Sequence, residues 1–228
     1  MTPGVFVTGT DTGCGKTRVC VTLIEHVRGA GLRAAGFKPV AAGAEWCDGQ
    51  LQNDDAMALR AAGGLDLDYA VVNPYCFEPP VAPHLAAAES GVTIEPDRIR
   101  AARDVLGAAC DFLVVEGAGG WRVPLGPGFD MQGLALELRL PVLLVVGLRL
   151  GCLNHALLSE QAILASGAPL LGWVGSQVDP GMARLNENIA TLRSGLSVPC
   201  LGILTHPQSG TALDRALPLQ IGDLIASV

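Results

Sequence analysis

Residues 7–17, with the sequence VTGTDTGCGKT, decide how the rest of the chain is interpreted. The apolar run at 5–8 leads directly into this glycine-rich stretch, and helical spacing of apolar residues begins immediately after Lys16. In such a turn, backbone N–H groups point inward at the start of a helix, where Lys16 can reach the β and γ phosphates of a nucleotide and Thr17 can bind Mg²⁺. The stretch therefore predicts a phosphate-binding loop between a strand and a helix.

The loop is one residue longer than the common pattern G-x4-G-K-[ST], because five residues separate Gly9 from Gly15. A glycine-rich connection without a ligand is the alternative interpretation, and the strand–loop–helix context argues against it. A dinucleotide-binding loop would need G-x-G-x-x-G, which this stretch lacks.

Short apolar runs alternate with segments of helical spacing along the chain. We expect buried strands at residues 5–8, 34–37, 112–115, 142–146, 171–174 and 201–204. Helical patterns follow Lys16, Asp55, Pro96, Asp130, Asn154 and Met182. This alternation predicts a single α/β domain over residues 1–228, of the P-loop nucleoside triphosphatase type, with a mostly parallel sheet and helices on both faces. Ligands of such sheets bind at the carboxyl ends of the strands.

The composition is that of a folded protein with little charge. Of the 228 residues, 50% are hydrophobic, 4% aromatic and 16% charged, against about 25% charged in ordinary globular domains. This excludes disorder. A low charge fraction also suggests that part of the surface is covered, so we expect a homo-oligomer.

Charge and hydropathy exclude several classes of function. The net charge is −7 and no basic run occurs, so we expect no nucleic-acid or membrane partner. The longest apolar run, residues 140–148, is nine residues long, against about 20 needed to cross a bilayer. The first ten residues lack the parts of a secretory signal, and we expect a cytoplasmic protein.

Two lysines stand out among the cationic residues. Thirteen of the fifteen are arginine, and Lys16 and Lys38 are the only lysines. Lysine carries a compact point charge, whereas the guanidinium group of arginine is planar and wider. Lys16 and Lys38 therefore indicate positions where a guanidinium group does not fit. Lys38 follows the second expected strand, which places it at the same sheet edge as the phosphate-binding loop. The alternative is a solvated lysine at a strand end.

Carboxylates occur at two further positions of this edge. Residues 112–116, FLVVE, form an apolar run that ends in Glu116 and continues into glycine-rich 117–120, the pattern of a Walker B strand whose carboxylate binds Mg²⁺. A solvated strand end is the alternative. Residues 53–55, NDD, begin a helical pattern, and we expect Asp54 to be the N-cap of that helix. For Asp55 two interpretations remain open, a surface residue of the helix or a residue of the functional site.

Other catalytic chemistries find no support in the sequence. The seven cysteines include no CxxC pair, the four histidines no HExxH spacing, and no G-x-S-x-G elbow occurs. We therefore expect no disulfide framework, zinc site or serine nucleophile. Cys14, inside the loop, is expected to be a small apolar filler.

Seven motifs in order resemble the dethiobiotin synthetase family, including its own longer form of the glycine loop. The motifs are VTGTDTGCGKT (7–17), GFKPVAAG (36–43), NDDA (53–56), VVNPYCFEPPVAPH (71–84), VEGAGGWRVPL (115–125), LPVLLVVGLRLGCLNHALL (140–158) and GWV (172–174), so that the resemblance extends to about residue 204. The family closes the ureido ring of dethiobiotin from 7,8-diaminononanoate, CO₂ or bicarbonate, and ATP with Mg²⁺, in biotin synthesis.

The resemblance implies a role for each matching residue. Lys38, Lys16 and Thr12 would be catalytic, and Thr17, Asp55 and Glu116 would bind Mg²⁺. The ATP site would comprise Gly13, Cys14, Gly15, Lys16, Thr17, Arg18, Asp55, Glu116, Gly117, Ala118, Gly119, Ser176, Gln177, Thr205, His206 and Pro207. The substrate site would comprise Lys38, Ala42, Gly151, Cys152 and Asn154. The family is a homodimer in which the 151–154 turn of one chain meets substrate bound mainly by the other.

The sequence departs from the family at four places. Ala42 and Ala82 stand where the family usually has hydroxyls, and Ser176-Gln177 follow the GWV motif where the family has an asparagine that recognises the base. Residues 205–207, which would lie against the base, also differ from the family's common form. The choice of nucleotide is therefore left open. A dimeric switch ATPase, which would carry a lysine at the position of Asp11, remains a rival, as does another P-loop amidoligase or kinase. A GTPase would need an N-K-x-D motif, and none occurs.

Overall fold

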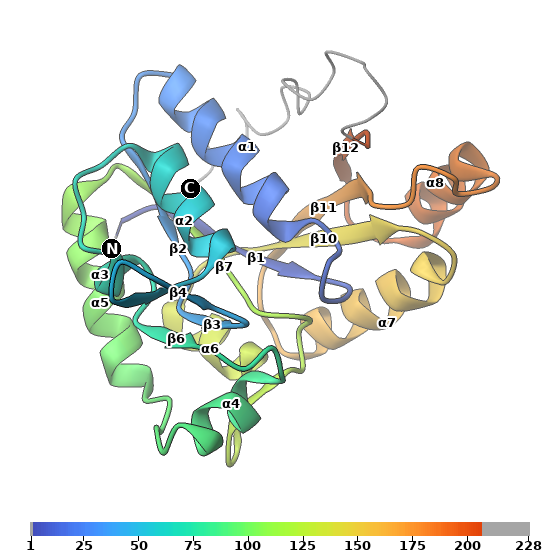
Figure 1. Cartoon of the computed structure of the whole chain (residues 1–228). Coiled ribbons are helices and arrows are strands. Elements are labelled where there is room, and N and C mark those ends of the chain that lie inside the picture. The colour runs from blue at the N-terminus through green and yellow to red at the C-terminus, as the bar shows by residue number, and fades with distance from the viewer. Residues whose placement is uncertain (1, 207–228) are drawn as a thin grey trace.

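A computed structural model describes residues 2–206 and shows a six-stranded parallel sheet at its centre (Figure 1). Its strand order is β12-β11-β10-β1-β7-β2. The strands are β1 (Gly4–Gly9), β2 (Ala34–Phe37), β7 (Phe112–Glu116), β10 (Val142–Leu148), β11 (Leu170–Gln177) and β12 (Cys200–Leu204). All six expected strands are confirmed, most of them longer than expected by one to three residues at their ends.

Helices cover both faces of the sheet, as expected (Figure 1). On one face lie α1 (Lys16–Gly29) and α2 (Asp54–Gly63), and on the other lie α5 (Pro96–Ala109), α6 (Met131–Leu138) and α7 (Cys152–Ala165). Successive residues of a strand point to opposite faces, so Val5 and Val7 pack under α1 while Phe6 packs on the other side. Both faces are buried, which explains the unbroken apolar runs in the sequence.

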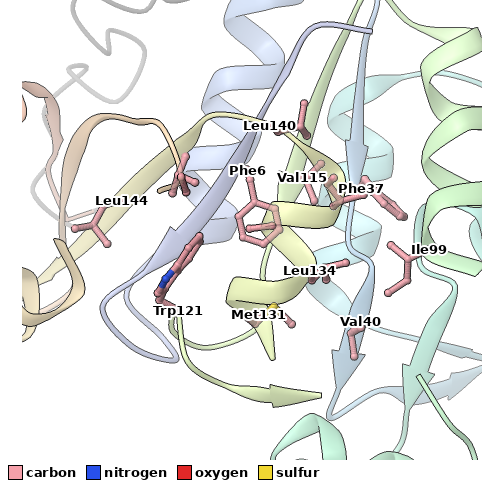
Figure 2. Packing of buried hydrophobic residues seen from close by; sticks show 14 of the residues in the cluster. Phe6, Phe37, Val40, Ile99, Val115, Trp121, Met131, Leu134, Leu140 and Leu144 are labelled. Carbon is pink, nitrogen blue, oxygen red and sulfur yellow. The ribbon is translucent and has the colours of Figure 1, made fainter. Parts of the chain in front are cut away.

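The larger core lies beneath α5, α6 and α7 (Figure 2). Phe6 is fully buried at its centre, and the edge of its ring meets Trp121 with centroids 6.3 Å apart. Phe37 and Val115 pack from the neighbouring strands. Trp121 follows the second glycine-rich stretch, so this packing ties the loop after β7 to the central strand.

Shorter elements that the sequence did not predict are attached to the carboxyl edge of the sheet. They are β3 (Val40–Ala42), β4 (Glu45–Cys47), β5 (Gln50–Gln52), α3 (Tyr69–Val72), β6 (Tyr75–Phe77), α4 (Pro83–Glu89), β8 (Pro124–Gly126) and β9 (Phe129–Asp130). The β3 and β6 strands form a small parallel pair, and the other two pairs are antiparallel. The helix α8 (Leu185–Gly195) connects β11 to β12.

The expected N-cap of α2 is wrong by one residue. Asn53, not Asp54, caps the helix, since its side-chain Oδ1 accepts a hydrogen bond from the Ala56 N–H at 3.3 Å. The apolar face sets this choice, because Ala56 and Leu59 must both face the core. Asp55 then lies in the first turn and is directed at the sheet edge.

No helix within residues 2–206 is long and apolar enough to cross a membrane.

Candidate active site

The loop after β1 is fastened to the neighbouring strand β10. The Thr10 N–H donates to the Val145 carbonyl at 2.9 Å, and the Thr10 hydroxyl accepts from the Gly147 N–H at 3.3 Å. Thr10 stands where the common motif has its first glycine. Its hydroxyl thus gives the longer loop an anchor that a glycine cannot supply.

Gly15 leaves no room for a side chain. Its φ is +93°, in the left-handed region that favours glycine, and a Cβ there would collide with the Ser176 Oγ. Ser176 is itself buried at the carboxyl end of β11. The loop therefore rests on β11 as well as on β10.

Lys16 lies inside the loop that surrounds it. Its Nζ donates to the Asp11 carbonyl at 2.9 Å and lies 3.9 Å from the Cys14 Sγ, and its side chain is buried. Cys14 is fully buried, which agrees with its interpretation as a filler. Asp11 in turn forms an ion pair with Arg149, a partner that the sequence did not indicate.

Four segments of the chain bring together a lysine, two carboxylates and a hydroxyl. Lys38, just after β2, donates from Nζ to Asp55 Oδ2 at 2.8 Å and to Glu116 Oε1 at 2.6 Å. The Thr17 hydroxyl, in the first turn of α1, lies 2.6 Å from Asp55 Oδ1 and 3.0 Å from Glu116 Oε1. The expectation that Lys38 lies at the same sheet edge as the loop is confirmed, and a solvated lysine is excluded because its exposed fraction is 4%.

Burial and charge act in opposite directions on these groups. Burial disfavours the Lys38 cation, but the two adjacent carboxylates outweigh it and raise the pKa of Lys38 above its ordinary value. Burial likewise disfavours the Asp55 carboxylate, yet Lys38 and Thr17 lower the pKa of Asp55. For Glu116, only 1% exposed, burial prevails over Lys38, and with the added repulsion of Asp55 its pKa is raised.

The oxygen atoms of this cluster fit a bound Mg²⁺. Glu116 Oε2 is buried and has no hydrogen-bond partner among the described residues, which is the condition of a carboxylate oxygen left for a cation. Thr17 Oγ1 and Asp55 Oδ1 lie beside the other Glu116 oxygen. Residues 2–206 hold no cluster of three or more His, Cys, Asp or Glu side chains suited to a metal. A hydroxyl with two carboxylates suits Mg²⁺, which takes its remaining ligands from phosphates and water.

The cluster forms the floor of a cavity of about 600 Å³. Its lining combines residues of the loop and the cluster with small apolar residues from β3 and the segment before α4. The lining residues are Thr12, Gly13, Gly15, Lys16, Thr17, Lys38, Ala41, Ala42, Asn53, Asp55, Pro80, Val81, Ala82, Pro83, Glu116, Ala118, Gly119 and Val123. The loop around Lys16 and apolar residues that include Ala42 thus line one cavity.

The remaining site residues predicted from the sequence lie outside this cavity. Gly151, Cys152 and Asn154 lie at the N-terminus of α7, where Asn154 is exposed. The residues predicted to bind the base lie at the ends of β11 and β12, where Gln177 Oε1 accepts from the His206 N–H at 3.2 Å. Of the rest, Arg18 is half-buried in α1, Gly117 is buried beside the Phe6 ring, and Pro207 lies outside the described residues.

Apart from Ala42, the apolar residues that line the cavity were not predicted from the sequence as site residues. Pro80, Val81 and Pro83 belong to the EPPVAPH stretch, to which no role was assigned. Asn53 was grouped with the acidic pair only as a possible helix start. The signal that could have found these residues is the row of prolines, which fixes the backbone of a segment that carries no helical or strand pattern.

Comparisons with known proteins agree on family and fold. A family model described as an AAA domain matches residues 3–211. The ATP-dependent dethiobiotin synthetase BioD of Aromatoleum aromaticum is 53% identical over 95% of this chain and 96% of its own, and that of Pseudomonas aeruginosa PAO1 is 49% identical over 97% and 98%. Among solved structures, the septum site-determining protein MinD of Pyrococcus horikoshii (TM-score 0.52, 15% identity) and the cell division protein FtsY of Thermotoga maritima (0.51, 16%) share the fold. Each similarity covers 90% of this chain, with 82% of MinD and 62% of FtsY.

The parallel sheet, the loop around Lys16 and the carboxylate at the end of β7 define the chain as a P-loop nucleoside triphosphatase. Within that class it belongs to the ATP-dependent dethiobiotin synthetase family, as its identity of about one half over nearly the whole length of these relatives shows.

Gly15→Ala is expected to weaken nucleotide binding, because the new methyl group collides with Ser176 and the backbone must leave its left-handed conformation. The matched control is Gly31→Ala, at φ +85° with no atom within 4 Å of the added Cβ. Isothermal titration with Mg·ATP should show at least a tenfold weaker affinity for Gly15→Ala and an unchanged one for Gly31→Ala. Adding Ser176→Gly to Gly15→Ala should restore part of the binding, and normal affinity of Gly15→Ala would contradict the packing described.

Proposed function

We propose that this protein uses ATP and Mg²⁺ to convert 7,8-diaminononanoate and CO₂ into dethiobiotin, ADP and phosphate, as a homodimer. One observation carries the proposal: Lys38 is buried between Asp55 and Glu116 in a cavity that is lined both by the loop around Lys16 and by small apolar residues. That arrangement suits a reaction in which a phosphoryl group passes to a small, partly aliphatic substrate. Family membership supplies the identity of the substrate.

Nucleotide binding falls to the loop and the helix that follows it. The backbone of residues 13–17 would hold the phosphates at the N-terminus of α1, and Lys16 would donate to the β and γ phosphates. Thr17, Asp55 and Glu116 would hold Mg²⁺, which when bound neutralises charge on the phosphates. The choice between ATP and another nucleoside triphosphate rests on residues 176–177 and 205–207.

The substrate would lie against the apolar residues of the cavity. Ala41, Ala42 and Ala82 offer contact to methylene groups and leave room near Lys38. An amine of the substrate adds its lone pair to CO₂, forms an N–C bond and loses a proton, giving a carbamate. The side chain of Ala42 cannot donate a hydrogen bond to that carbamate, whose side-chain contacts would come from Lys38 and Thr12, with water completing them.

Lys38 then serves as a fixed cation. A carbamate oxygen attacks the γ phosphorus, the bond to the bridging oxygen of ADP breaks, and a carbamic-phosphoric anhydride forms. The second amine attacks the carbamate carbon and gives up a proton to water, the C–O bond to phosphate breaks, and the ring closes. Because the pKa of Lys38 is raised, it remains protonated at neutral pH and stabilises the developing negative charge rather than acting as a base. No protein nucleophile takes part.

The dimer would complete the substrate site. Leu150 is 94% exposed just before α7, and Leu158, 56% exposed, lies four residues after Asn154 on the same face of that helix. Leucine at these positions is typical of a surface covered by a partner. A second copy packed here would bring the 151–154 turn to the substrate bound by its neighbour.

Activity is tested by ADP release with Mg·ATP and bicarbonate, with and without 7,8-diaminononanoate, followed by mass spectrometry of the product. ADP release that depends on the diamine and a product with the mass of dethiobiotin are expected. Hydrolysis that ignores the diamine and yields no such product would contradict the proposal and favour a switch ATPase. Repeating the assay with CTP and GTP measures the choice of nucleotide.

Lys38→Arg should retain Mg·ATP binding and lower kcat about a hundredfold, since a planar guanidinium cannot place one charge between two carboxylates in so small a buried space. Arg33→Lys, in an exposed ion pair with Asp111 away from the cavity, is the control and should leave kcat unchanged. Wild-type turnover by Lys38→Arg would remove Lys38 from the chemistry.

Leu158→Glu should convert the dimer to monomers and raise KM for the diamine, because the site would lose the residues from the other chain. Val105→Glu places the same charge on α5 at a residue of similar exposure and should change neither. Light scattering and steady-state kinetics measure both effects. A wild-type protein that is monomeric at assay concentration and fully active would exclude a shared site.

A further inference from the structure

A buried polar network lies behind the cluster of Lys38, Asp55 and Glu116, and the reaction described above assigns it no part. It consists of the Tyr69 hydroxyl, the Asn73 side chain and the backbone of Asn53. Tyr69 is 3% exposed, Asn73 2% and Asn53 8%. Most polar groups so deeply buried are hydrogen-bonded, so their partners show what the network holds.

The Tyr69 hydroxyl forms the junction of this network. Its oxygen accepts from the Asn53 N–H at 2.8 Å, and its proton is donated to Asn73 Oδ1 at 2.9 Å. The Cys76 Sγ lies 3.4 Å from the same oxygen and can donate to its second lone pair. A phenol has one proton and two lone pairs, so all its capacity is used.

One arm of the network reaches the backbone of Lys38. Asn73 Nδ2 donates to the Lys38 carbonyl at 2.6 Å and to the Tyr75 carbonyl at 3.1 Å. The Lys38 N–H donates to the Val72 carbonyl at 2.9 Å, within the same short segment. Both polar backbone groups of Lys38 are thus held by the 72–73 segment, which fixes the point from which its side chain enters the cavity.

The other arm reaches the first turn of α2. Asn53, the N-cap residue, donates its backbone N–H to the Tyr69 hydroxyl. The side chain of Asn53 caps the helix by accepting a hydrogen bond from the Ala56 N–H. Asp55 lies between these two residues, so its position follows from where the helix begins. Tyr69 is therefore hydrogen-bonded directly to the N-cap of the helix that carries Asp55, and through Asn73 to the backbone of Lys38.

We infer that Tyr69 is a positioning residue that sets the placement of Lys38 relative to Asp55 through Asn73 and Asn53. The two groups lie 2.8 Å apart at the cavity floor, and a displacement of about 1 Å at a reacting centre can lower a rate by orders of magnitude. Tyr69 does not line the cavity, so it acts through the residues it holds. This inference rests on the proposed function, because it is that reaction whose rate the placement would govern.

The test compares the only two tyrosines of the chain. Tyr69→Phe removes the junction hydroxyl. Tyr75→Phe is the matched control, since Tyr75 is also 3% exposed and its hydroxyl also accepts one backbone hydrogen bond, from the Glu95 N–H at 2.9 Å, without reaching Lys38 or Asp55. Both variants should lower the melting temperature by similar amounts. Only Tyr69→Phe should lower kcat, by about tenfold, with KM for the diamine changed less than twofold.

A binding measurement separates positioning from loss of stability. The affinity for β,γ-methylene-ATP is measured by calorimetry in MgCl₂ and in EDTA for the wild type and both variants. The dissociation constant in EDTA divided by that in MgCl₂, here called the magnesium ratio, measures how much Mg²⁺ strengthens binding. It therefore reports how well Thr17, Asp55 and Glu116 are placed to bind the cation. That ratio should fall about fivefold in Tyr69→Phe and stay at the wild-type value in Tyr75→Phe. Asn73→Ala should show the same fall, and the double variant little more, because the two residues act as one unit.

The outcomes also distinguish this inference from the proposed function. If wild-type protein forms dethiobiotin while Tyr69→Phe and Tyr75→Phe have equal kcat values and equal magnesium ratios, Tyr69 only stabilises the fold and the inference is wrong. If folded wild-type protein forms no dethiobiotin, the proposed function fails on its own. The magnesium ratio then still tests whether Tyr69 sets the geometry of the cluster.

Discussion

The ion pairs of Lys38 with Asp55 and Glu116 are the interaction on which the rest of the site depends. Removing the lysine would leave two carboxylates side by side, one of them almost wholly buried, and breaking a buried pair in this way costs about 3–5 kcal/mol. The fold must therefore deliver the end of β2, the start of α2 and the end of β7 to one place together. Two of these segments are held by adjacent strands of the sheet, and the third by the cap of a helix that packs on it.

The parallel sheet gives these groups a common edge and gives the phosphate loop its support. Thr10 binds to β10, Gly15 rests on Ser176 of β11, and Trp121 ties the loop after β7 to Phe6 in the core. Each contact joins a glycine-rich loop to a strand of the sheet or to the core beneath it. The site is thus preorganised by packing, which electrostatic stabilisation of phosphoryl transfer requires.

The sequence was most informative where one pattern determines one structure. Runs such as 112–116 are apolar throughout because both faces of the strand are covered, and all six were found. Lys38 was found because it and Lys16 are the only lysines among fifteen lysine and arginine residues. By contrast, Asn53, Asp54 and Asp55 can each cap a helix, and only the packing of Ala56 and Leu59 decides among them. The link from Tyr69 to Lys38 and Asp55 depends on side chains that meet only after folding, so no spacing predicts it.

The central claim is that this cluster promotes attack of a carbamate oxygen on ATP. Following that oxygen into the released phosphate tests the claim directly. We would supply ¹⁸O-labelled bicarbonate with the diamine and Mg·ATP and analyse the released phosphate by mass spectrometry. Because the carbamate oxygen that attacks phosphorus leaves with it, the account predicts one ¹⁸O in each phosphate formed, after correction for exchange of the label with water. Phosphate without label from bicarbonate, but with label when the solvent is H₂¹⁸O, would show that water attacks ATP and would contradict the account.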